Sequence, residues 1–345
     1  MTFKTAELNL RDDFQSAKRL DATELQRLIE PVKDDFAVFD DKMAEFLKGD
    51  SPLISSIAQH LLKSKGKRIR PALLFLLTRA SGTFDERTVD ASLAIELIHA
   101  ATLLHDDVVD ESHMRRNQET VNSKWTNLIA VLMGDYLFAK AFKIMSAVGS
   151  LPLMQAISQA TEQVSVGELR QIEETRNYDV SEKEYLRIIA DKTASLFDVA
   201  CQVGPILGGL DEEKRRKCSQ FGSALGTSFQ IADDLLDFVG DSRVTGKEPG
   251  NDVITGKVTL PLIYSLQHSG SARAEQIKKM LSNGVSQEDF PRVLDFVRET
   301  GGIDYAYNRA EQICQEGFEA VNFLDGSEYF QSLTQIADFA TRRAG

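Results

Sequence analysis

The chain has 345 residues, enough for one large domain or two, and its 42% hydrophobic and 27% charged content is that of a globular protein, not a disordered one. Its 40 Lys and Arg residues against 52 Asp and Glu residues give a net charge of −12, which argues against a general nucleic-acid-binding protein. The 3 cysteines are too widely spaced for a disulfide framework or a zinc site, and 8 prolines are few for this length, which favours helices.

The sequence also bears on the location of the protein. No uncharged apolar stretch approaches the roughly 18 residues that span a bilayer. The first 15 residues lack the apolar centre of a signal peptide. Together with the unpaired cysteines, these features predict a protein of the cytoplasm.

Apolar residues recur at spacings of three and four along the chain, whereas alternating β-branched runs are few, so the sequence predicts helices. The first helix begins near residue 22 and kinks or restarts at Pro31, and a cationic loop at 63–70 separates the next two helices. Glycine-containing breaks follow, but no linker divides the chain, which predicts a single all-α domain over 1–345 with about ten helices. The long helices are predicted, in order, at 89–110, 127–146, 153–174, 182–207 and 213–239.

Two segments share the pattern Asp-Asp-x-x-Asp: DDVVD at 106–110 and DDLLD at 233–237. The aspartate content of the chain predicts only about 0.2 copies by chance. Within each segment the first and last aspartates are four residues apart, so they lie on one face of a helix. Both segments sit in apolar sequence, where carboxylates are costly unless they are paired or bound to metal, and Mg²⁺ prefers such oxygen ligands. The pattern therefore predicts two metal-binding carboxylate sets, and the alternative is surface carboxylates matched by Lys or Arg.

Cationic residues recur near both aspartate motifs, as a site that clamps a diphosphate would need. Each of them alone is also compatible with a solvated surface. A nucleic-acid patch at 63–70 is disfavoured because no aromatic residues are interleaved there. The cations are Lys67 and Arg70 in GKRIRP, Arg115 and Arg116 after the first motif, Lys192 beside Thr193, and Lys247 and Lys257 after the second motif.

Taken together, these motifs resemble those of the all-trans polyprenyl diphosphate synthase family. The resemblance covers about residues 30–340, and it is greatest to the long-chain octaprenyl- and solanesyl-type enzymes that make quinone side chains. Six segments carry it, in chain order: GKRIRP (66–71), ELIHAATLLHDDVVDESHMRRN (96–117), GDYLF (134–138), KTASLF (192–197), GTSFQIADDLLD (226–237) and GKEPGNDVITGKVTLP (246–261). One position departs from the family pattern, because Asn117 stands where a glycine is usual after the arginine pair; Asn tolerates a left-handed turn better than most residues.

The resemblance implies a bundle of mostly antiparallel helices around a central cavity, with the two aspartate motifs facing each other at its mouth, in a homodimer. It implies about three Mg²⁺ ions in each active site. Their main ligands would be Asp106, Asp110 and Asp233, supported by Asp107, Asp234 and Asp237. Isopentenyl diphosphate would be held by Lys67, Arg70, His99 and Arg116, and the allylic diphosphate by Arg115, Lys192, Thr193, Gln230, Lys247 and Lys257.

The implied reaction is an alkyl transfer. Mg²⁺ and fixed cations neutralise the leaving diphosphate, and the allylic C–O bond ionises. The double bond of isopentenyl diphosphate attacks the cation, and a proton is lost to leave a trans alkene. No protein base is evident in the sequence, and the resemblance implies that the released diphosphate takes the proton. Asp106, Asp110, Asp233, Lys192 and Arg115 are the predicted catalytic residues.

Product length is predicted from the residues one and two turns before Asp106, which would line the path of the growing chain. These are Thr102, Ala101 and Ile98. No bulky aromatic residue blocks the path at this depth, so a product of about C35–C45 is predicted, with transient membrane contact at its release. A deeper floor is expected from Leu132, Met133 or Phe138. Ala101 is also compatible with simple helix packing.

Other functions remain open at this point. A shorter-chain farnesyl or geranylgeranyl diphosphate synthase would share all the motifs. A terpene cyclase would need neither GKRIRP nor the second Asp-Asp-x-x-Asp motif. A non-catalytic subunit of a heteromeric synthase tends to lose one aspartate motif, and both are present here. A helical binding scaffold would explain the periodicity but none of the six motifs.

Overall fold

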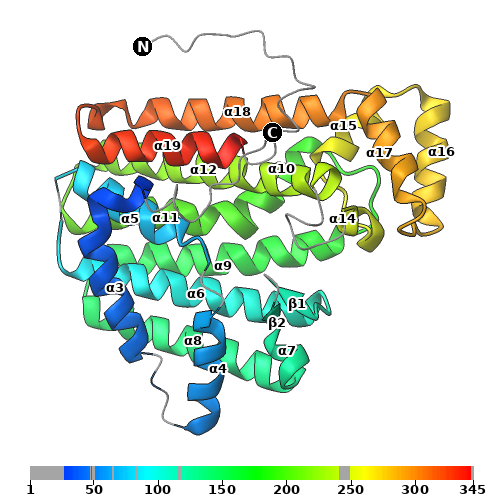
Figure 1. Cartoon of the computed structure of the whole chain (residues 1–345). Helices are drawn as coiled ribbons and strands as arrows, with labels where there is room; N and C mark the ends of the chain where they lie inside the picture. Colours follow the sequence, from blue (N-terminus) through cyan, green and yellow to red (C-terminus); the bar gives the residue numbers. More distant parts are fainter. Residues whose placement is uncertain are drawn as a thin grey trace.

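The computed structural model describes residues 27–46, 48, 51–63, 66–82, 84–115, 118–240 and 249–342. Helices run through nearly all of these ranges, which confirms the all-α prediction (Figure 1). Within the described ranges the strands are limited to a short hairpin, in which β1 (Met114–Arg115) pairs antiparallel with β2 (Gln118–Glu119). The sequence did not predict this hairpin. The start of the first predicted helix, near residue 22, lies outside the described residues.

The helical elements follow one another in the following order. They are η1 (Glu30–Val32), α3 (Lys33–Phe46), α4 (Pro52–Lys63), α5 (Ile69–Ala80), α6 (Arg87–Val109), α7 (Val121–Lys124), α8 (Asn127–Val148), α9 (Leu151–Glu173), α10 (Glu182–Ile189), η2 (Ala190–Ala194), α11 (Ser195–Leu207), α12 (Glu212–Val239), α14 (Asn251–Thr255), α15 (Leu260–His268), α16 (Ser271–Ser282), α17 (Phe290–Glu299), α18 (Gly302–Ala320), η3 (Asn322–Leu324) and α19 (Glu328–Arg342).

Local sequence signals account for the helix ends. Thr126, Ser150 and Asp211 precede α8, α9 and α12, and each side chain accepts a hydrogen bond from a backbone N–H of the first turn. Gly149 ends α8 with φ +68°, a left-handed conformation that glycine adopts without strain. Pro31 lies in the 3-10 turn η1, and α3 restarts directly after it, as the sequence predicted.

The segment 182–207, predicted as one helix, is interrupted by the π-helical turn η2 between α10 and α11. This turn approaches α9 very closely at Gly167. A Cβ atom added at Gly167 would lie 2.4 Å from the backbone nitrogen of Lys192. Because π turns often mark functional positions, the location of Lys192 and Thr193 in η2 directs attention to these two residues.

The helices pack in layers that Figure 1 shows edge-on, with α18 at the top, α12 beneath it, and α9, α6 and α8 below. The helix α6 packs along α8, while α12 packs against both α11 and α18. Two apolar clusters form the core, one around α5, α6 and α11 and one around α15, α17 and the second half of α12. Residues of α12 and α18 belong to both clusters, so these two helices connect them. Among the described residues, no helix is both long enough and apolar enough to cross a bilayer.

Candidate active site

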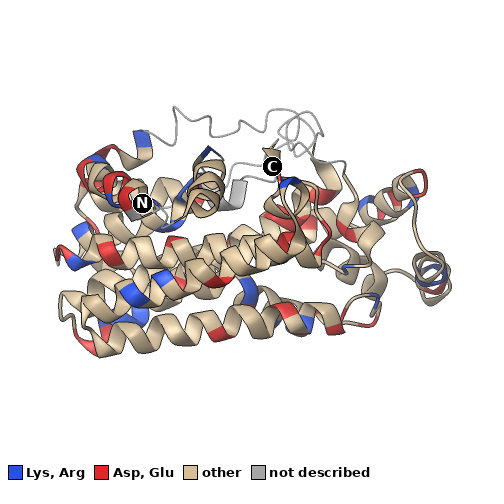
Figure 2. Cartoon of the chain, turned by 90° about the horizontal axis from the view of Figure 1, so that it is seen from below, with Lys and Arg blue, Asp and Glu red and all other residues tan. Residues whose placement is uncertain are grey.

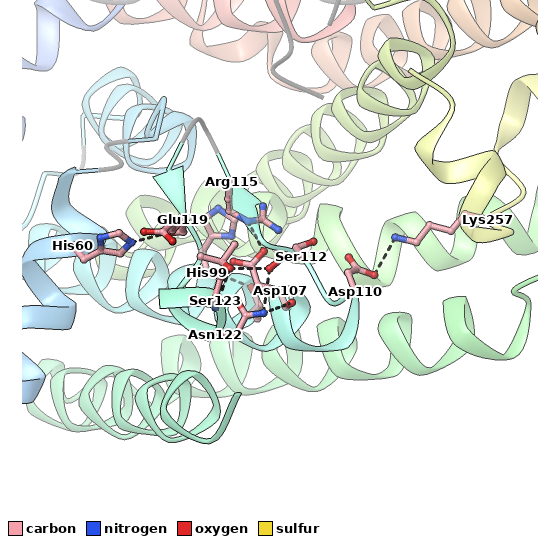
Figure 3. Close-up of polar contacts among 12 residues, drawn as sticks. His60, His99, Asp107, Asp110, Ser112, Arg115, Glu119, Asn122, Ser123 and Lys257 are labelled. Carbon is pink, nitrogen blue, oxygen red and sulfur yellow. Dashed lines mark hydrogen bonds and ion pairs between the residues drawn. The ribbon is translucent and has the colours of Figure 1, made fainter. Parts of the chain in front are cut away.

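The first aspartate motif lies where α6 ends. Asp106 and Asp107 are in its last turn, and Asp110 is the residue that caps its C-terminus. Burial raises the pKa of Asp106 to about 6. The Asp110 carboxylate is exposed and accepts a hydrogen bond from Lys257 Nζ at 3.3 Å (Figure 3). The motif therefore presents carboxylates to a place that is only partly solvated, where a bound cation would stabilise their charge.

Asp107 has a different role from its neighbours, because this residue is buried at 4% exposure. Its carboxylate accepts a hydrogen bond from Arg115 Nε at 2.8 Å, and Arg115 is the second residue of β1. The turn α7, which follows the hairpin, is tied to the end of α6 by Asn122, whose side-chain amide donates to the backbone carbonyls of Asp107 and Ser112 (Figure 3). Asp107 thus fixes the Arg115 side chain beside the motif.

The second motif lies near the end of α12, and its middle aspartate is again the buried one. Asp234 accepts hydrogen bonds from the Tyr185 hydroxyl at 2.6 Å and from the Gln230 amide at 2.8 Å. Burial raises the pKa of Asp234. Thr193 in turn donates to the Gln230 carbonyl oxygen at 2.8 Å, so the η2 turn and α12 are joined by a chain of hydrogen bonds.

The last aspartate of the second motif acts as a cap for α14. The two carboxylate oxygens of Asp237 accept hydrogen bonds from the backbone N–H groups of Asn251 at 3.1 Å and Asp252 at 3.0 Å. The first aspartate, Asp233, is exposed. In each motif, therefore, one or two aspartates organise the protein. Asp110 and Asp233 are the exposed members, and Asp106 is half-buried.

These carboxylates suit metal ions whose coordination shell is completed by the oxygen atoms of a diphosphate. Among the described residues, no three acidic, histidine or cysteine side chains come together closely enough to form a metal site by themselves. Mg²⁺ in phosphate sites takes one or two carboxylates and completes its shell with water and phosphate oxygens. Separate carboxylates on α6 and α12, with Lys257 beside Asp110, match that requirement.

Lys192 projects from η2 and pairs with Glu168 of α9, and it lies 3.4 Å from Gln171 Oε1. Lys192 is close enough to Asp106 to lower its pKa, and Glu168 acts in the opposite direction. Sequence reasoning missed Glu168, because a single glutamate on an amphipathic helix gives no spacing signal. The adjacent Gly167, which allows η2 to approach α9, is the only sequence feature beside Glu168 that we connect with its position.

Lys257 connects the two motifs. It contacts Asp110 at the end of α6, and it follows α14, whose first turn is capped by Asp237. Burial would lower the pKa of Lys257, but the carboxylates of Asp252 and Asp110 outweigh it and raise the pKa. The ammonium group therefore stays charged beside Asp110, where it offsets the negative charge of the first motif.

The comparisons with known proteins agree with this geometry. The family model described as Polyprenyl synthetase matches residues 51–297. The octaprenyl diphosphate synthase of Haemophilus influenzae is 35% identical over 320 residues, which cover 93% of this chain and 96% of that enzyme. The chain belongs to the polyprenyl synthetase family. It is therefore an enzyme that makes polyprenyl diphosphate, and the resemblance seen in the sequence is confirmed.

Two further similarities are to a relative from Bacillus and to a solved structure. Component 2 of the heptaprenyl diphosphate synthase of Bacillus subtilis is 34% identical over 313 residues, covering 90% of this chain and 89% of that protein. A crystal structure of a polyprenyl synthase from Caulobacter crescentus, complexed with calcium and isoprenyl diphosphate, has a TM-score of 0.88 at 32% identity. It covers 93% of this chain and 98% of that one, so the two share a fold over nearly their whole length.

Of the residues predicted to hold isopentenyl diphosphate, the structure describes three, and all three side chains are half-buried. Lys67 lies two residues before α5, and Arg70 lies in the first turn of α5 with its guanidinium 4.5 Å from the ring centre of Phe197. His99 lies on α6, two turns before Asp106. The fourth residue, Arg116, lies outside the described residues, as do Asn117 and the predicted allylic ligand Lys247.

The predicted chain-length residues differ in accessibility. Ile98 and Ala101 are fully buried at 0% exposure, whereas Thr102 is half-buried and donates a hydrogen bond to the His99 carbonyl at 2.8 Å. Of the residues expected at a deeper floor, Met133 is buried, but Leu132 is 57% exposed and points away from the core. Because Leu132 is exposed, it does not form the floor of a product cavity that lies within one chain.

Proposed function

We propose that this enzyme lengthens an allylic diphosphate by repeated addition of isopentenyl diphosphate, with Mg²⁺ as cofactor, to a trans product of about C35–C45. Within that range an octaprenyl product is the specific proposal, and a quinone side chain is its proposed use. One observation carries the proposal most. Lys257 contacts Asp110, while Asp237 caps the helix that precedes Lys257, so both aspartate motifs border one cationic site.

The fixed cations of the site would bind the allylic diphosphate. Lys192 pairs with Glu168, Lys257 with Asp110, and Arg115 with Asp107. These pairs keep the cations in place, and each cation has further donor capacity for a diphosphate oxygen. The half-buried surroundings strengthen such charge-assisted bonds relative to water.

Asp106, Asp110 and Asp233 are the proposed Mg²⁺ ligands, with Asp107, Asp234 and Asp237 in support. About three Mg²⁺ ions would supply neutralisation of the charge that develops on the departing diphosphate. The Caulobacter polyprenyl synthase was crystallised in complex with calcium and isoprenyl diphosphate, which supports the use of a divalent cation by this enzyme. Loss of the diphosphate would let the double bond of isopentenyl diphosphate attack the allylic carbon, and the released diphosphate would take the proton.

The proposed product length rests on the small residues near Asp106. Thr102 is partly accessible and Ala101 has no bulk, so the side of α6 that leads away from Asp106 carries no aromatic block at these positions. The name of the Haemophilus relative also points to a long product. A very apolar product of this length would contact a membrane transiently at its release.

A homodimer is proposed as the active assembly, with a single catalytic domain in each chain. The outer face of α8 exposes Leu128 at 69%, Val131 at 38% and Leu132 at 57%. Leu169 and Ile172 are exposed at the end of α9, and in Figure 2 long stretches of ribbon on the underside carry no charged residue. Apolar surface of this kind is typical of an interface, and a second copy is its proposed occupant.

The Bacillus relative is one component of a heptaprenyl diphosphate synthase, so a heteromer is the second candidate assembly. Both aspartate motifs of this chain are intact, which favours catalysis by the chain itself. We place the enzyme in the cytoplasm, with isopentenyl and allylic diphosphates as its substrates.

Metal dependence tests the proposed reaction most simply. Labelled isopentenyl diphosphate and farnesyl diphosphate are incubated with the purified protein, with EDTA or with increasing Mg²⁺. Condensation should require Mg²⁺, and Asp233→Asn should lower kcat by about 100-fold or more, because one metal ligand loses its charge. Asp41→Asn, at an exposed position of α3, is the matched control. Turnover in EDTA equal to that in Mg²⁺ would contradict the proposal.

A further inference from the structure

The helix α10 and the turn η2 that continues it are joined to one turn of α12 at two points. At the first point, the Tyr185 hydroxyl of α10 donates to Asp234 Oδ2 at 2.6 Å. At the second, the Thr193 hydroxyl of η2 donates to Gln230 Oε1 at 2.8 Å. Gln230 and Asp234 are four residues apart on one face of α12, and the Gln230 amide donates to Asp234 Oδ1 at 2.8 Å. The four side chains therefore form one continuous chain of hydrogen bonds.

The buried carboxylate of Asp234 sets the orientation of the Gln230 amide. Asp234 is 6% exposed, and its two oxygens accept from Tyr185 and from Gln230. Because the amide nitrogen of Gln230 faces the carboxylate, its carbonyl oxygen is the end that faces Thr193. An amide nitrogen carries two hydrogens, so one remains for a diphosphate oxygen. Asp234 thus orients a residue that is proposed to bind the allylic diphosphate.

Tyr185 holds Asp234 from within the core. The tyrosine is 4% exposed, and its ring belongs to the apolar cluster around α15, α17 and the second half of α12. Burial, and after it the carboxylate of Asp234, raise the pKa of the Tyr185 hydroxyl, so this group keeps its proton and donates it. Loss of this donor would leave one oxygen of a buried carboxylate without its partner, which favours a rearrangement of Asp234.

The chain of hydrogen bonds reaches residues of the proposed allylic site. Thr193 and Gln230 belong to it, and Lys192 lies in η2 directly before Thr193. The described residues proposed for isopentenyl diphosphate lie instead before α5, in its first turn, and on α6. Loss of the Tyr185 hydroxyl should therefore affect the binding of the two substrates unequally.

We propose that Tyr185 is a positioning residue for the allylic diphosphate, because it fixes Asp234 and, through Asp234, the Gln230 amide and the Thr193 end of η2. Tyr185 is buried behind the second aspartate motif and acts through Asp234. This inference rests on the proposed function, since it assigns a task within that same site.

Two variants separate the positioning role from a general loosening of α10. Tyr185→Phe removes the hydroxyl and keeps the ring in its apolar cluster. Tyr305→Phe is the matched control, because the Tyr305 hydroxyl also donates to a carboxylate at 2.6 Å and also anchors α10, at its first residue Glu182. A variant that only loosens α10 would therefore behave like Tyr305→Phe.

Initial-rate kinetics with Mg²⁺ compare the KM values of the two substrates. We expect Tyr185→Phe to raise KM for farnesyl diphosphate about fivefold or more, with KM for isopentenyl diphosphate within about twofold of the wild type. Tyr305→Phe should leave both KM values within about twofold. Equal rises of both KM values in Tyr185→Phe, an unchanged KM for farnesyl diphosphate, or the same rise in Tyr305→Phe would overturn the positioning role.

Calorimetric binding of farnesyl thiodiphosphate gives a second readout that does not depend on turnover. In this allylic analogue sulfur replaces the ester oxygen, so that the bond to carbon ionises slowly. With Mg²⁺ present, its Kd should rise about fivefold or more in Tyr185→Phe and stay within about twofold in Tyr305→Phe. Equal Kd values for the wild type and Tyr185→Phe would overturn the positioning role. A wild type that neither condenses the substrates nor binds the analogue would contradict the proposed function and, with it, this inference.

Discussion

At Asp106, a carboxylate is kept in surroundings that disfavour its charge. Its neighbour Asp107 is more deeply buried but has the Arg115 guanidinium as a direct partner. Burial raises the pKa of Asp106 to about 6, so at pH 8 the folded protein carries a negative charge that would cost less free energy in the unfolded chain. This cost is expected of a residue kept for a ligand and not for stability.

Asp106→Asn should therefore have opposite effects on activity and stability. Activity should fall by about 100-fold or more because a metal ligand is lost. At pH 8 the metal-free variant should be more stable than wild type, by at most about 3 kcal/mol, since a raised carboxyl pKa of about 6 penalises folding at all higher pH values. The gain should shrink as pH falls through 6 toward 4, where wild-type Asp106 becomes protonated in the folded state.

Urea unfolding in EDTA at pH 8 and pH 5, compared with the Asp41→Asn control, checks this prediction. A variant less stable than wild type at pH 8 would show that Asp106 has a stabilising partner in the folded protein.

The sequence predicted the aspartate motifs but not the division of labour within them. Spacing places Asp233 and Asp237 on one face of a helix, yet Asp237 caps α14 and Asp234 binds Tyr185. These partners come from segments that are far away in the sequence or that follow a loop, and local pattern contains no information about them. Glu168 was missed for the same reason.

At the scale of elements, the long helices were predictable because apolar periodicity and end caps agree. The helices α6, α8, α9 and α12 begin and end within about two residues of the predicted bounds. The hairpin was not predictable, because two residues in each strand are too few for any alternation to show. The π turn η2 was also missed, since it depends on how closely α9 approaches at Gly167.

Gly167→Ala tests that close approach. By helix propensity alone, alanine would stabilise α9 by about 1 kcal/mol. The new Cβ would lie 2.4 Å from the Lys192 nitrogen, so α9 and η2 must separate, and the protein should lose about 1–3 kcal/mol of stability. Activity should fall as well, because Lys192 moves with η2. Thermal unfolding and kcat measurements check this prediction, with Ser158→Ala on the exposed face of α9 as the control. A Gly167→Ala variant that is stabilised and active would contradict the close approach of α9 to η2.

At the scale of the whole molecule, α12 and α18 run through both apolar clusters, and α12 also carries the second aspartate motif. The first motif lies on α6, and both α6 and α12 pack against α11, so packed helices place the two motifs relative to each other. Such a scaffold suits a reaction in which two diphosphates must meet in a fixed geometry. The sequence predicted this architecture only through the family resemblance, because helix order alone does not state which helices face each other.

The apolar face of α8 provides a prediction at this scale. Leu132→Glu puts a charge at the centre of the proposed dimer interface, and burying an unpaired carboxylate there should favour the monomer. Size-exclusion chromatography with light scattering should show a dimer for wild type and a shift toward monomer for Leu132→Glu. Leu53→Glu, at a leucine of α4 that is 46% exposed, is the control and should remain dimeric. A monomeric wild type would contradict the proposed interface on α8.

Product analysis of the wild type beside Thr102→Phe tests the central claim most directly. Both proteins are incubated with Mg²⁺, farnesyl diphosphate and labelled isopentenyl diphosphate, and the dephosphorylated products are separated by length. Wild type should end at about C35–C45, and Thr102→Phe should stop at about C20 or shorter, because the new ring blocks the path one turn from Asp106. Wild-type products that stop at about C20, or equal product lengths for the two proteins, would contradict the proposed route of the growing chain along α6.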